Sequence, residues 1–263
     1  ADPLTLRSCL NIASGTILHR PYDEAPVSNL YLWGRKEDLA FEQPLGHDPR
    51  RRHHVRFWHS GTLDGDGRCT FEQCNADGKA TVLAEKFNGH PLNNPNDITI
   101  ARNGTIFFTD NSRDESGQMP PTVFRLKDGQ LTPVVKGLQG PNGITLSPNG
   151  RVLYVSDSDA RLVRAYDLDG KGAASKERVV IEKIPGVPGG IRTDEKGNLY
   201  VAAKDVLVYA LPNNGPAKLL GEIPLRETPS NLAFGDQDMA TLYITARTGV
   251  YRVRLGVKGA LPY

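Results

Sequence analysis

The chain reads PNDITIARNGTIFFTD over residues 95–110 and PNGITLSPNGRVLYVSD over residues 141–157. Each stretch holds two short runs rich in Ile, Val, Phe and Tyr that flank an Asn-Gly turn, a pattern typical of an antiparallel hairpin. Looser copies begin at Pro188 and Pro229, so the four prolines are spaced by 46, 47 and 41 residues. A repeat of about 40 to 50 residues with this content indicates the blades of a β-propeller.

Outer strands are expected after each clear hairpin, at residues 122–126 and 131–135 and at residues 162–166 and 178–181. These runs are apolar or alternate with period two, and no stretch has a convincing helical period. We therefore expect an all-β fold, a six-bladed β-propeller of four-stranded antiparallel blades around a central channel. It would form a single domain over residues 1–263, with clear repeats over 86–263 and irregular first blades over 1–85.

The charge balance excludes some classes of partner. The chain has 32 basic and 30 acidic residues and a formal net charge of +2, so no broad field favours nucleic acid or an anionic membrane. No apolar run approaches the roughly 20 residues that cross a bilayer. A small molecule is the expected partner, and the protein is expected to be a monomer or weak dimer. The sequence leaves the cellular compartment open.

Asn96 and Asn142 occupy the same place in successive repeats, directly after the proline that opens each innermost strand. Inner strands of a propeller start at one end of the channel, so these side chains are expected to converge. Amide oxygens are hard ligands that suit Ca²⁺ and are accepted by Mg²⁺ or Mn²⁺. The alternative is that Asn is there for its turn-forming chemistry, because it bonds its own backbone and tolerates left-handed conformations.

The motifs resemble those of the gluconolactonase, senescence marker protein 30 and luciferin-regenerating enzyme family of six-bladed propeller lactonases. The resemblance covers residues 78–258 and implies a divalent ion at the channel mouth, Ca²⁺ first, with Zn²⁺, Mg²⁺ or Mn²⁺ as alternatives. The implied metal ligands are Glu24, Asn96 and Asn142, and Asn96 and Arg192 are assigned to substrate binding. The motifs that carry the resemblance lie at residues 92–97, 140–144, 194–201, 231–235 and 241–245.

One position departs from the family pattern. Gly189 stands where the family carries an Asp that binds the metal and is often proposed as the general base. Asp97 and Asp157 are then the candidate catalytic bases. Asp157 ends an inner run at the position that Asp110 occupies one repeat earlier, so both could instead cap strand ends.

The predicted function is a metal-dependent hydrolase that opens a sugar lactone or related cyclic ester. In this hypothesis the ion polarises the ring carbonyl, activates water and stabilises the oxyanion. The alternatives are a non-catalytic propeller that binds a sugar or protein with a structural metal, and a strictosidine-synthase-like enzyme. Paired histidines are a further source of a base, and the chain offers a group of them early on: His47, His53, His54, His59 and His90.

Overall fold

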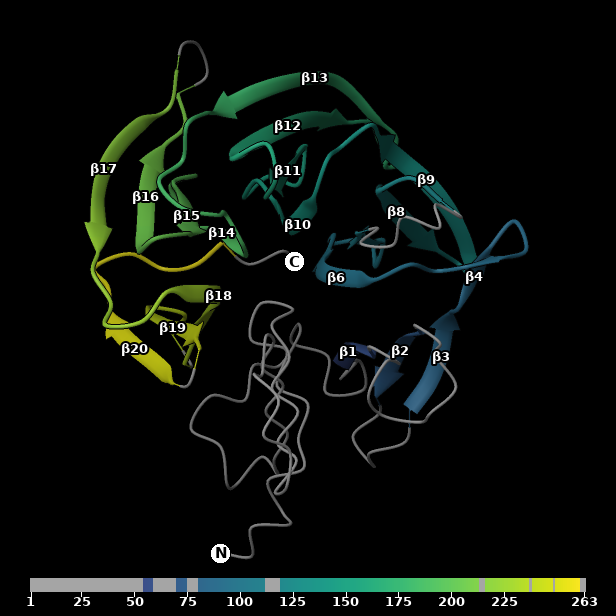
Figure 1. The fold of residues 1–263 in the computed structure, drawn as a ribbon, viewed down its shortest axis with the longest axis horizontal. Helices are drawn as coiled ribbons and strands as arrows, with labels where there is room; N and C mark the ends of the chain where they lie inside the picture. Colours follow the sequence, from purple (N-terminus) through teal and green to yellow (C-terminus); the bar gives the residue numbers. More distant parts are fainter. Residues whose placement is uncertain are drawn as a thin grey trace, which may run out of the picture.

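The protein is built from β-strands, and the described residues contain no helix. The computed structural model describes residues 54–58, 70–74, 80–111, 119–212, 216–236, 238–247 and 249–260, the first two segments and residues 80–81 by their backbone only. Figure 1 shows sheets arranged around a centre, with β6, β10, β14 and β18 facing inward. With no helix in these ranges, none is long and apolar enough to span a bilayer.

Three sheets have four strands each, and neighbouring strands follow one another in sequence and run antiparallel. The first sheet holds β6 (Pro95–Ile100), β7 (Ile106–Asp110), β8 (Thr122–Lys127) and β9 (Gln130–Lys136). The second holds β10 (Pro141–Leu146), β11 (Val152–Asp157), β12 (Leu162–Leu168) and β13 (Ala174–Ile181). The third holds β14 (Ile191–Thr193), β15 (Leu199–Ala202), β16 (Val206–Ala210) and β17 (Lys218–Ile223).

Smaller sheets lie on either side of these three in the sequence. One has the strands β18 (Pro229–Gly235), β19 (Thr241–Ala246) and β20 (Val250–Arg254). Another has β1 (His54–Trp58), β2 (Thr70–Cys74) and β3 (Ala80–Ala84), and a two-stranded ribbon joins β4 (Lys86–Phe87) to β5 (His90–Pro91). The predicted all-β propeller of four-stranded antiparallel blades is confirmed. The number of six blades and the extent of the single domain stay predictions.

Glycine makes the tight turns that the repeat predicts between the first two strands of the three four-stranded blades. Gly104, Gly150 and Gly197 have φ values of +77°, +68° and +83°. Residues with a Cβ rarely adopt this left-handed conformation, whereas glycine does so at little cost. The Asn-Gly turns in the sequence therefore correspond to real chain reversals in the blades.

The hydrophobic core lies between blades. In one cluster Phe107 and Val123 of the first four-stranded sheet pack against Ile144 and Leu153 of the second. A second cluster joins Val163 to strands of the third sheet, and a third joins the third sheet to β18 and β19. Fully burying one such side chain contributes roughly 1.5 to 3 kcal/mol. Each blade therefore depends on its neighbours, as expected for this architecture.

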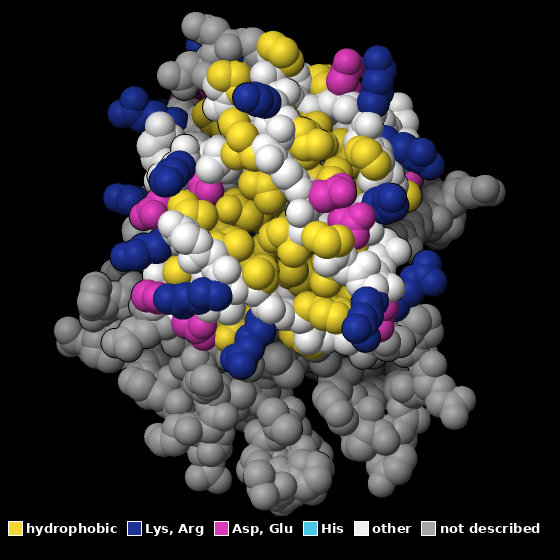
Figure 2. Space-filling view, turned by 90° about the vertical axis from the view of Figure 1, so that its left-hand side faces the viewer, with side chains coloured by type: hydrophobic (Ala, Val, Ile, Leu, Met, Phe, Trp, Pro, Cys, Tyr) yellow, Lys and Arg dark blue, Asp and Glu magenta, His cyan; other side chains and the backbone are white. Residues whose placement is uncertain are grey.

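Burial decreases from the channel outward. All residues of β15 and β19 are buried, whereas most of the outer strands β13 and β17 is exposed. Figure 2 shows the side of the molecule that lies at the left in Figure 1, where apolar side chains reach the surface among charged ones. Leu219 and Leu220 of β17 are about half exposed there. Buried polar groups occur on the inner strands and on the second strands of the blades, and Asp97, Thr109 and Ser156 are examples.

The inner strands share an irregularity at their first residues. The register between the first and second strands shifts between Pro95 and Ile98, between Pro141 and Ile144, and between Pro229 and Asn231. A β-bulge leaves extra residues unpaired and changes the direction of their side chains. The repeated Pro-Asn positions fall within these bulges, which explains how a strand can present polar groups at its start.

Candidate functional site

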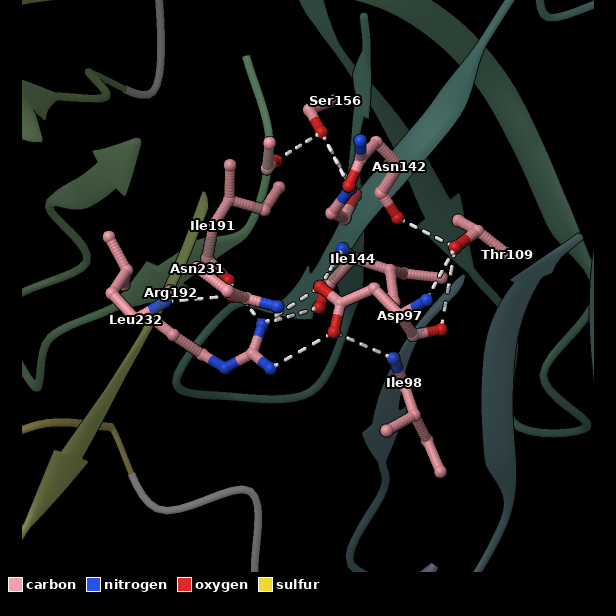
Figure 3. Close-up of polar contacts among 12 residues, drawn as sticks. Asp97, Ile98, Thr109, Asn142, Ile144, Ser156, Ile191, Arg192, Asn231 and Leu232 are labelled. Carbon is pink, nitrogen blue, oxygen red and sulfur yellow. Dashed lines mark hydrogen bonds and ion pairs between the residues drawn. The ribbon is translucent and has the colours of Figure 1, made fainter. Parts of the chain in front are cut away.

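Four chain segments, residues 95–98, 141–144, 188–191 and 229–232, meet at one end of the inner strands, and we call them the channel mouth. Direct hydrogen bonds join each segment to the blade beside it. Thr109 Oγ1 donates to the Asn142 carbonyl at 2.6 Å, and Ser156 Oγ donates to the Gly189 carbonyl at 2.7 Å. The predicted convergence of the repeated turns therefore exists in the folded chain (Figure 3).

Asn96 and Asn142 lie at equivalent places in β6 and β10 and are partly buried. Within the described part of the chain neither side-chain amide is hydrogen-bonded, although the Asn142 carbonyl accepts the bond from Thr109. An amide offers two N–H donors and one oxygen acceptor. No described residue uses these donors and acceptors of Asn96 and Asn142.

Asp97 is fully buried, and protein groups surround its carboxylate. Oδ1 accepts from the Ile98 backbone N–H at 2.9 Å, and Oδ2 accepts from the Ile144 backbone N–H of the next blade at 2.8 Å. Burial raises the pKa of Asp97, and the nearby Arg192 guanidinium opposes that shift. A carboxylate held in this way joins two blades.

Arg192 lies on β14 and reaches across the neighbouring blade to Asp97. Its Nη1 lies 3.2 Å from Asp97 Oδ2 and its Nη2 lies 3.3 Å from Oδ1, so the ion pair is bidentate. Nη1 also donates to the carbonyls of Ile144, at 3.0 Å, and of Ile191. Only 15% of the Arg192 side chain is exposed. The predicted substrate-binding residue Arg192 thus connects three successive blades (Figure 3).

Asp157 and Asp110 perform the same local task in neighbouring blades. Asp157 is fully buried and accepts from the backbone N–H groups of Gln139 and Gly140, at 3.1 and 2.9 Å. Asp110 accepts in the same way from the two residues that precede Pro95, at 3.1 and 2.6 Å. Burial raises the pKa of Asp110 to about 6. These bonds match the strand-end capping that the sequence offered as the alternative to catalysis.

Gly189 has no room for a side chain. A Cβ added there would lie 2.4 Å from the Ser230 carbonyl oxygen, which belongs to the backbone of the next blade. Gly190 is restricted as well, since its Cβ would overlap the side-chain oxygen of Asn231. At Gly189 and Gly190 the backbone therefore lies too close to the segment 230–231 of the next blade for a side chain to fit.

Several predicted residues lie where the structure gives no side-chain description. Glu24, His47, His53 and His59 fall outside the described residues, and His54 is described by its backbone in β1. His90 lies exposed on the short strand β5. Glu24 as a metal ligand and a histidine pair as a base therefore stay predictions.

The described residues fit a divalent ion only in part. Ca²⁺ takes six to eight oxygen ligands and usually includes carboxylates. Among the residues described, no three His, Cys, Asp or Glu side chains form a group able to hold a metal. The channel mouth offers the amides of Asn96 and Asn142, while the carboxylates of Asp97 and Asp157 are bonded to N–H groups. These residues alone do not complete a calcium site.

Sequence reasoning missed Thr109 and Ser156, which are both fully buried. Each lies in the second strand of its blade and bonds to the inner strand of the following one. The repeat contained a signal, since both hydroxyl residues directly precede the aspartate that ends the strand. Their bonding partner in another blade could not be read from local sequence.

The fold and these contacts define a β-propeller with a polar site at one end of its channel. Residues 62–248 match the family model described as SMP-30/Gluconolactonase/LRE-like region, so the chain belongs to that family and the resemblance is confirmed. A second model, described as LssY C-terminus, matches residues 1–83, the stretch that contains Glu24. The two matches overlap, and the second covers the predicted irregular blades.

Known relatives carry lactonase names. The chain is 32% identical over 193 residues to a gluconolactonase of Zymomonas mobilis, covering 66% of this chain and 54% of that protein. It is 28% identical over 216 residues to the lactonohydrolase oryL of Aspergillus oryzae, covering 70% and 49%. The chain thus spans about half the length of these relatives. A solved gluconolactonase of Xanthomonas campestris is 30% identical with a TM-score of 0.63, covering 73% of this chain and 70% of that one.

Proposed function

We propose that this protein hydrolyses small-molecule lactones, with sugar lactones as the first substrate class. The observation that carries the proposal is the pair of side-chain amides of Asn96 and Asn142, which lie at the starts of adjacent inner strands and bond to no described residue. Membership of the family and the similarity to the Zymomonas and Aspergillus enzymes support the same chemistry. Amides that both donate and accept suit the carbonyl and hydroxyl groups of an aldonolactone.

In the proposed reaction, water adds to the lactone carbonyl carbon and the ring C–O bond breaks. The product is a hydroxy acid, which releases one proton near neutral pH. Asn142 would bind the substrate carbonyl through an N–H donor of its side-chain amide. The neighbouring blade already holds the backbone of this residue, because Thr109 donates to its carbonyl. Donors fixed in advance stabilise the developing oxyanion without further reorganisation.

The candidate bases Asp97 and Asp157 are better suited to holding the backbone in this proposal. A general base must reach the attacking water within hydrogen-bond distance. Both carboxylates are fully buried and accept hydrogen bonds from backbone N–H groups. The proton acceptor is therefore sought among residues beyond these two, including the predicted histidines.

Metal dependence is a separate part of the proposal. Ca²⁺ is the first candidate, and Glu24 would have to supply a carboxylate for it, because the Asp97 carboxylate accepts hydrogen bonds from backbone N–H groups and pairs with Arg192. When bound, such an ion would act as a Lewis acid toward the lactone carbonyl. A chelator tests this part without affecting the test of hydrolysis itself.

The experiment is a proton-release assay on glucono-1,5-lactone and a panel of aldonolactones, corrected for spontaneous hydrolysis. Each reaction is run with added Ca²⁺ and with a chelator. We expect hydrolysis of at least one lactone and a fall of about 100-fold or more in kcat/KM for Asn142→Ala, on the scale of losing one oxyanion donor. The matched control is Asn149→Ala, an exposed turn residue at the other end of β10. No rate above background on any lactone would exclude the proposed function.

A binding propeller without catalysis is the second candidate, and Gly189 favours it because no carboxylate stands there. This candidate predicts that a lactone or sugar binds at the channel mouth and is recovered unchanged. Calorimetry with the same panel distinguishes the two, since hydrolysis would release heat continuously after binding.

A further inference from the structure

The segment that carries Asn142 is fixed by side chains on both sides. Four of its backbone groups are hydrogen-bonded to buried or largely buried side chains (Figure 3). Since neighbouring blades supply three of these bonds, the position of Asn142 depends on how the blades meet. Thr109 Oγ1 donates to Asn142 O at 2.6 Å, and Arg192 Nη1 donates to Ile144 O at 3.0 Å. Gly143 N–H donates to Ser156 Oγ at 2.7 Å, and Ile144 N–H donates to Asp97 Oδ2 at 2.8 Å.

Thr109 makes the contact closest to the Asn142 side chain. Its hydroxyl oxygen accepts from the Asp97 backbone N–H at 2.9 Å, which leaves the single hydroxyl proton free to be donated. Two carbonyls are within reach, Asn142 O at 2.6 Å and Asp97 O at 3.4 Å. The shorter bond is the stronger one, and Thr109 is fully buried, so water does not compete for it. The hydroxyl therefore links two blades in a defined direction.

We propose that Thr109 is a positioning residue for Asn142, and this inference rests on the proposed function of Asn142 in lactone binding. The hydroxyl holds the Asn142 carbonyl, and with it the Cα from which the side-chain amide extends. An amide that binds a reacting carbonyl needs a fixed Cα position, because a misplacement of 1 Å can lower the catalytic rate by about 100-fold.

The equivalent hydroxyls of the other blades provide comparisons. Ser156 donates to Gly189, which has no side chain to position. Thr245 of β19 lies opposite Asn231, is buried, and donates to the Asn231 carbonyl within its own blade at 3.2 Å. Of these three hydroxyls, Thr109 is the one that bonds across a blade boundary to a residue whose side-chain amide contacts no described partner.

The test compares Thr109→Val, which keeps the shape and removes the hydroxyl, with Thr109→Ser, which keeps the hydroxyl. Thr245→Val is the matched control, because it removes a buried hydroxyl from the equivalent position. For Thr109→Val we expect kcat on the best lactone to fall by about 10- to 100-fold with KM changed less than about 3-fold. Thr109→Ser and Thr245→Val should stay within about 3-fold of the wild type. An equal loss in Thr109→Val and Thr245→Val would overturn the proposal.

A second readout does not depend on activity. In ¹⁵N–¹H spectra the Asn142 side-chain amide is assigned by its absence in Asn142→Asp. We expect this resonance pair to shift or broaden in Thr109→Val and to be unchanged in Thr109→Ser and Thr245→Val. An unchanged pair in Thr109→Val would refute the positioning role. If the wild type hydrolyses no lactone, the proposed function fails while this readout still decides the role of Thr109.

Folding of the variants is checked first by urea denaturation. If Thr109→Val does not fold, Thr109→Ala takes its place, because the smaller side chain leaves space instead of placing a methyl group against the Asn142 carbonyl. The same two readouts then apply, and normal kcat together with an unchanged Asn142 amide in Thr109→Ala would contradict the proposal.

Discussion

Replacing Arg192 with methionine would leave the Asp97 carboxylate buried without its counter-ion. Breaking a buried ion pair by removing one partner costs about 3 to 5 kcal/mol. Asp97 keeps its bonds to the backbone N–H groups of Ile98 and Ile144, so we expect the lower end, about 3 kcal/mol at neutral pH. Asp97→Asn keeps the shape of the side chain, but its amide NH₂ would face a backbone N–H that now donates to the carboxylate oxygen. We expect this to lower the free energy of unfolding by about 1 to 3 kcal/mol.

The cost in Arg192→Met should depend on pH in a definite direction. Burial already raises the pKa of Asp97, and loss of the guanidinium raises it further. An acid whose pKa is raised in the folded state destabilises that state as pH increases through the range in which it ionises. The variant should therefore lose most stability at pH 8 and less at pH 5, where more of Asp97 is protonated.

The assay is urea denaturation followed by circular dichroism for the wild type, both single variants and Asp97→Asn/Arg192→Met, at pH 5 and pH 8. In the double variant neither charge is left unpaired. Its loss of unfolding free energy should therefore be smaller than the summed losses of the two single variants by at least about 1.5 kcal/mol. Arg178→Met is the control, because it breaks an Arg–Asp pair at 2.8 Å whose side chains are 43% and 35% exposed, and it should have a much smaller effect. A coupling below about 0.5 kcal/mol at both pH values would refute the buried pair as a link between blades.

Three further changes test local features. Burial raises the pKa of Asp110 to about 6, so the wild type should lose up to about 3 kcal/mol of stability relative to Asp110→Asn as pH rises from 4 to 7. Urea denaturation that gives both proteins the same dependence of stability on pH would contradict this. Gly143→Ala should cost at least about 3 kcal/mol or prevent folding, since its Cβ would lie 2.4 Å from the Gly189 carbonyl oxygen, whereas Gly170→Ala, with no atom within 4 Å, should change thermal stability little. Gly189→Asp should lower the melting temperature, because its Cβ would lie 2.4 Å from the Ser230 carbonyl oxygen. We also expect calorimetry to show no additional bound Ca²⁺. A stable variant with a new calcium site would contradict this and show that the two strands can separate.

The sequence by itself determined the repeating unit, because strand and turn signals are local. Period-two apolar runs and Asn-Gly turns predicted β6, β7, β10 and β11 with their hairpins, and the runs after them predicted the outer strands β8, β9, β12 and β13. The spacing of the prolines fixed the blade length. The same repeat placed Asn96 and Asn142 at equivalent positions, and the family resemblance that the motifs carried is confirmed.

Only the tertiary structure decided which polar side chain of the first Pro-Asn turn bonds to other blades and which does not. Asn96 and Asp97 are neighbours of similar turn chemistry. The Asn96 amide bonds to no described residue, whereas Asp97 is fully buried against Arg192, 95 residues away. Thr109 and Asn142 are joined across 33 residues in the same way. Local sequence predicts how a strand or turn forms, but burial and ion pairing depend on which blade lies beside it. The physical reason is that desolvation and partners for a buried polar group arise only when distant segments pack together.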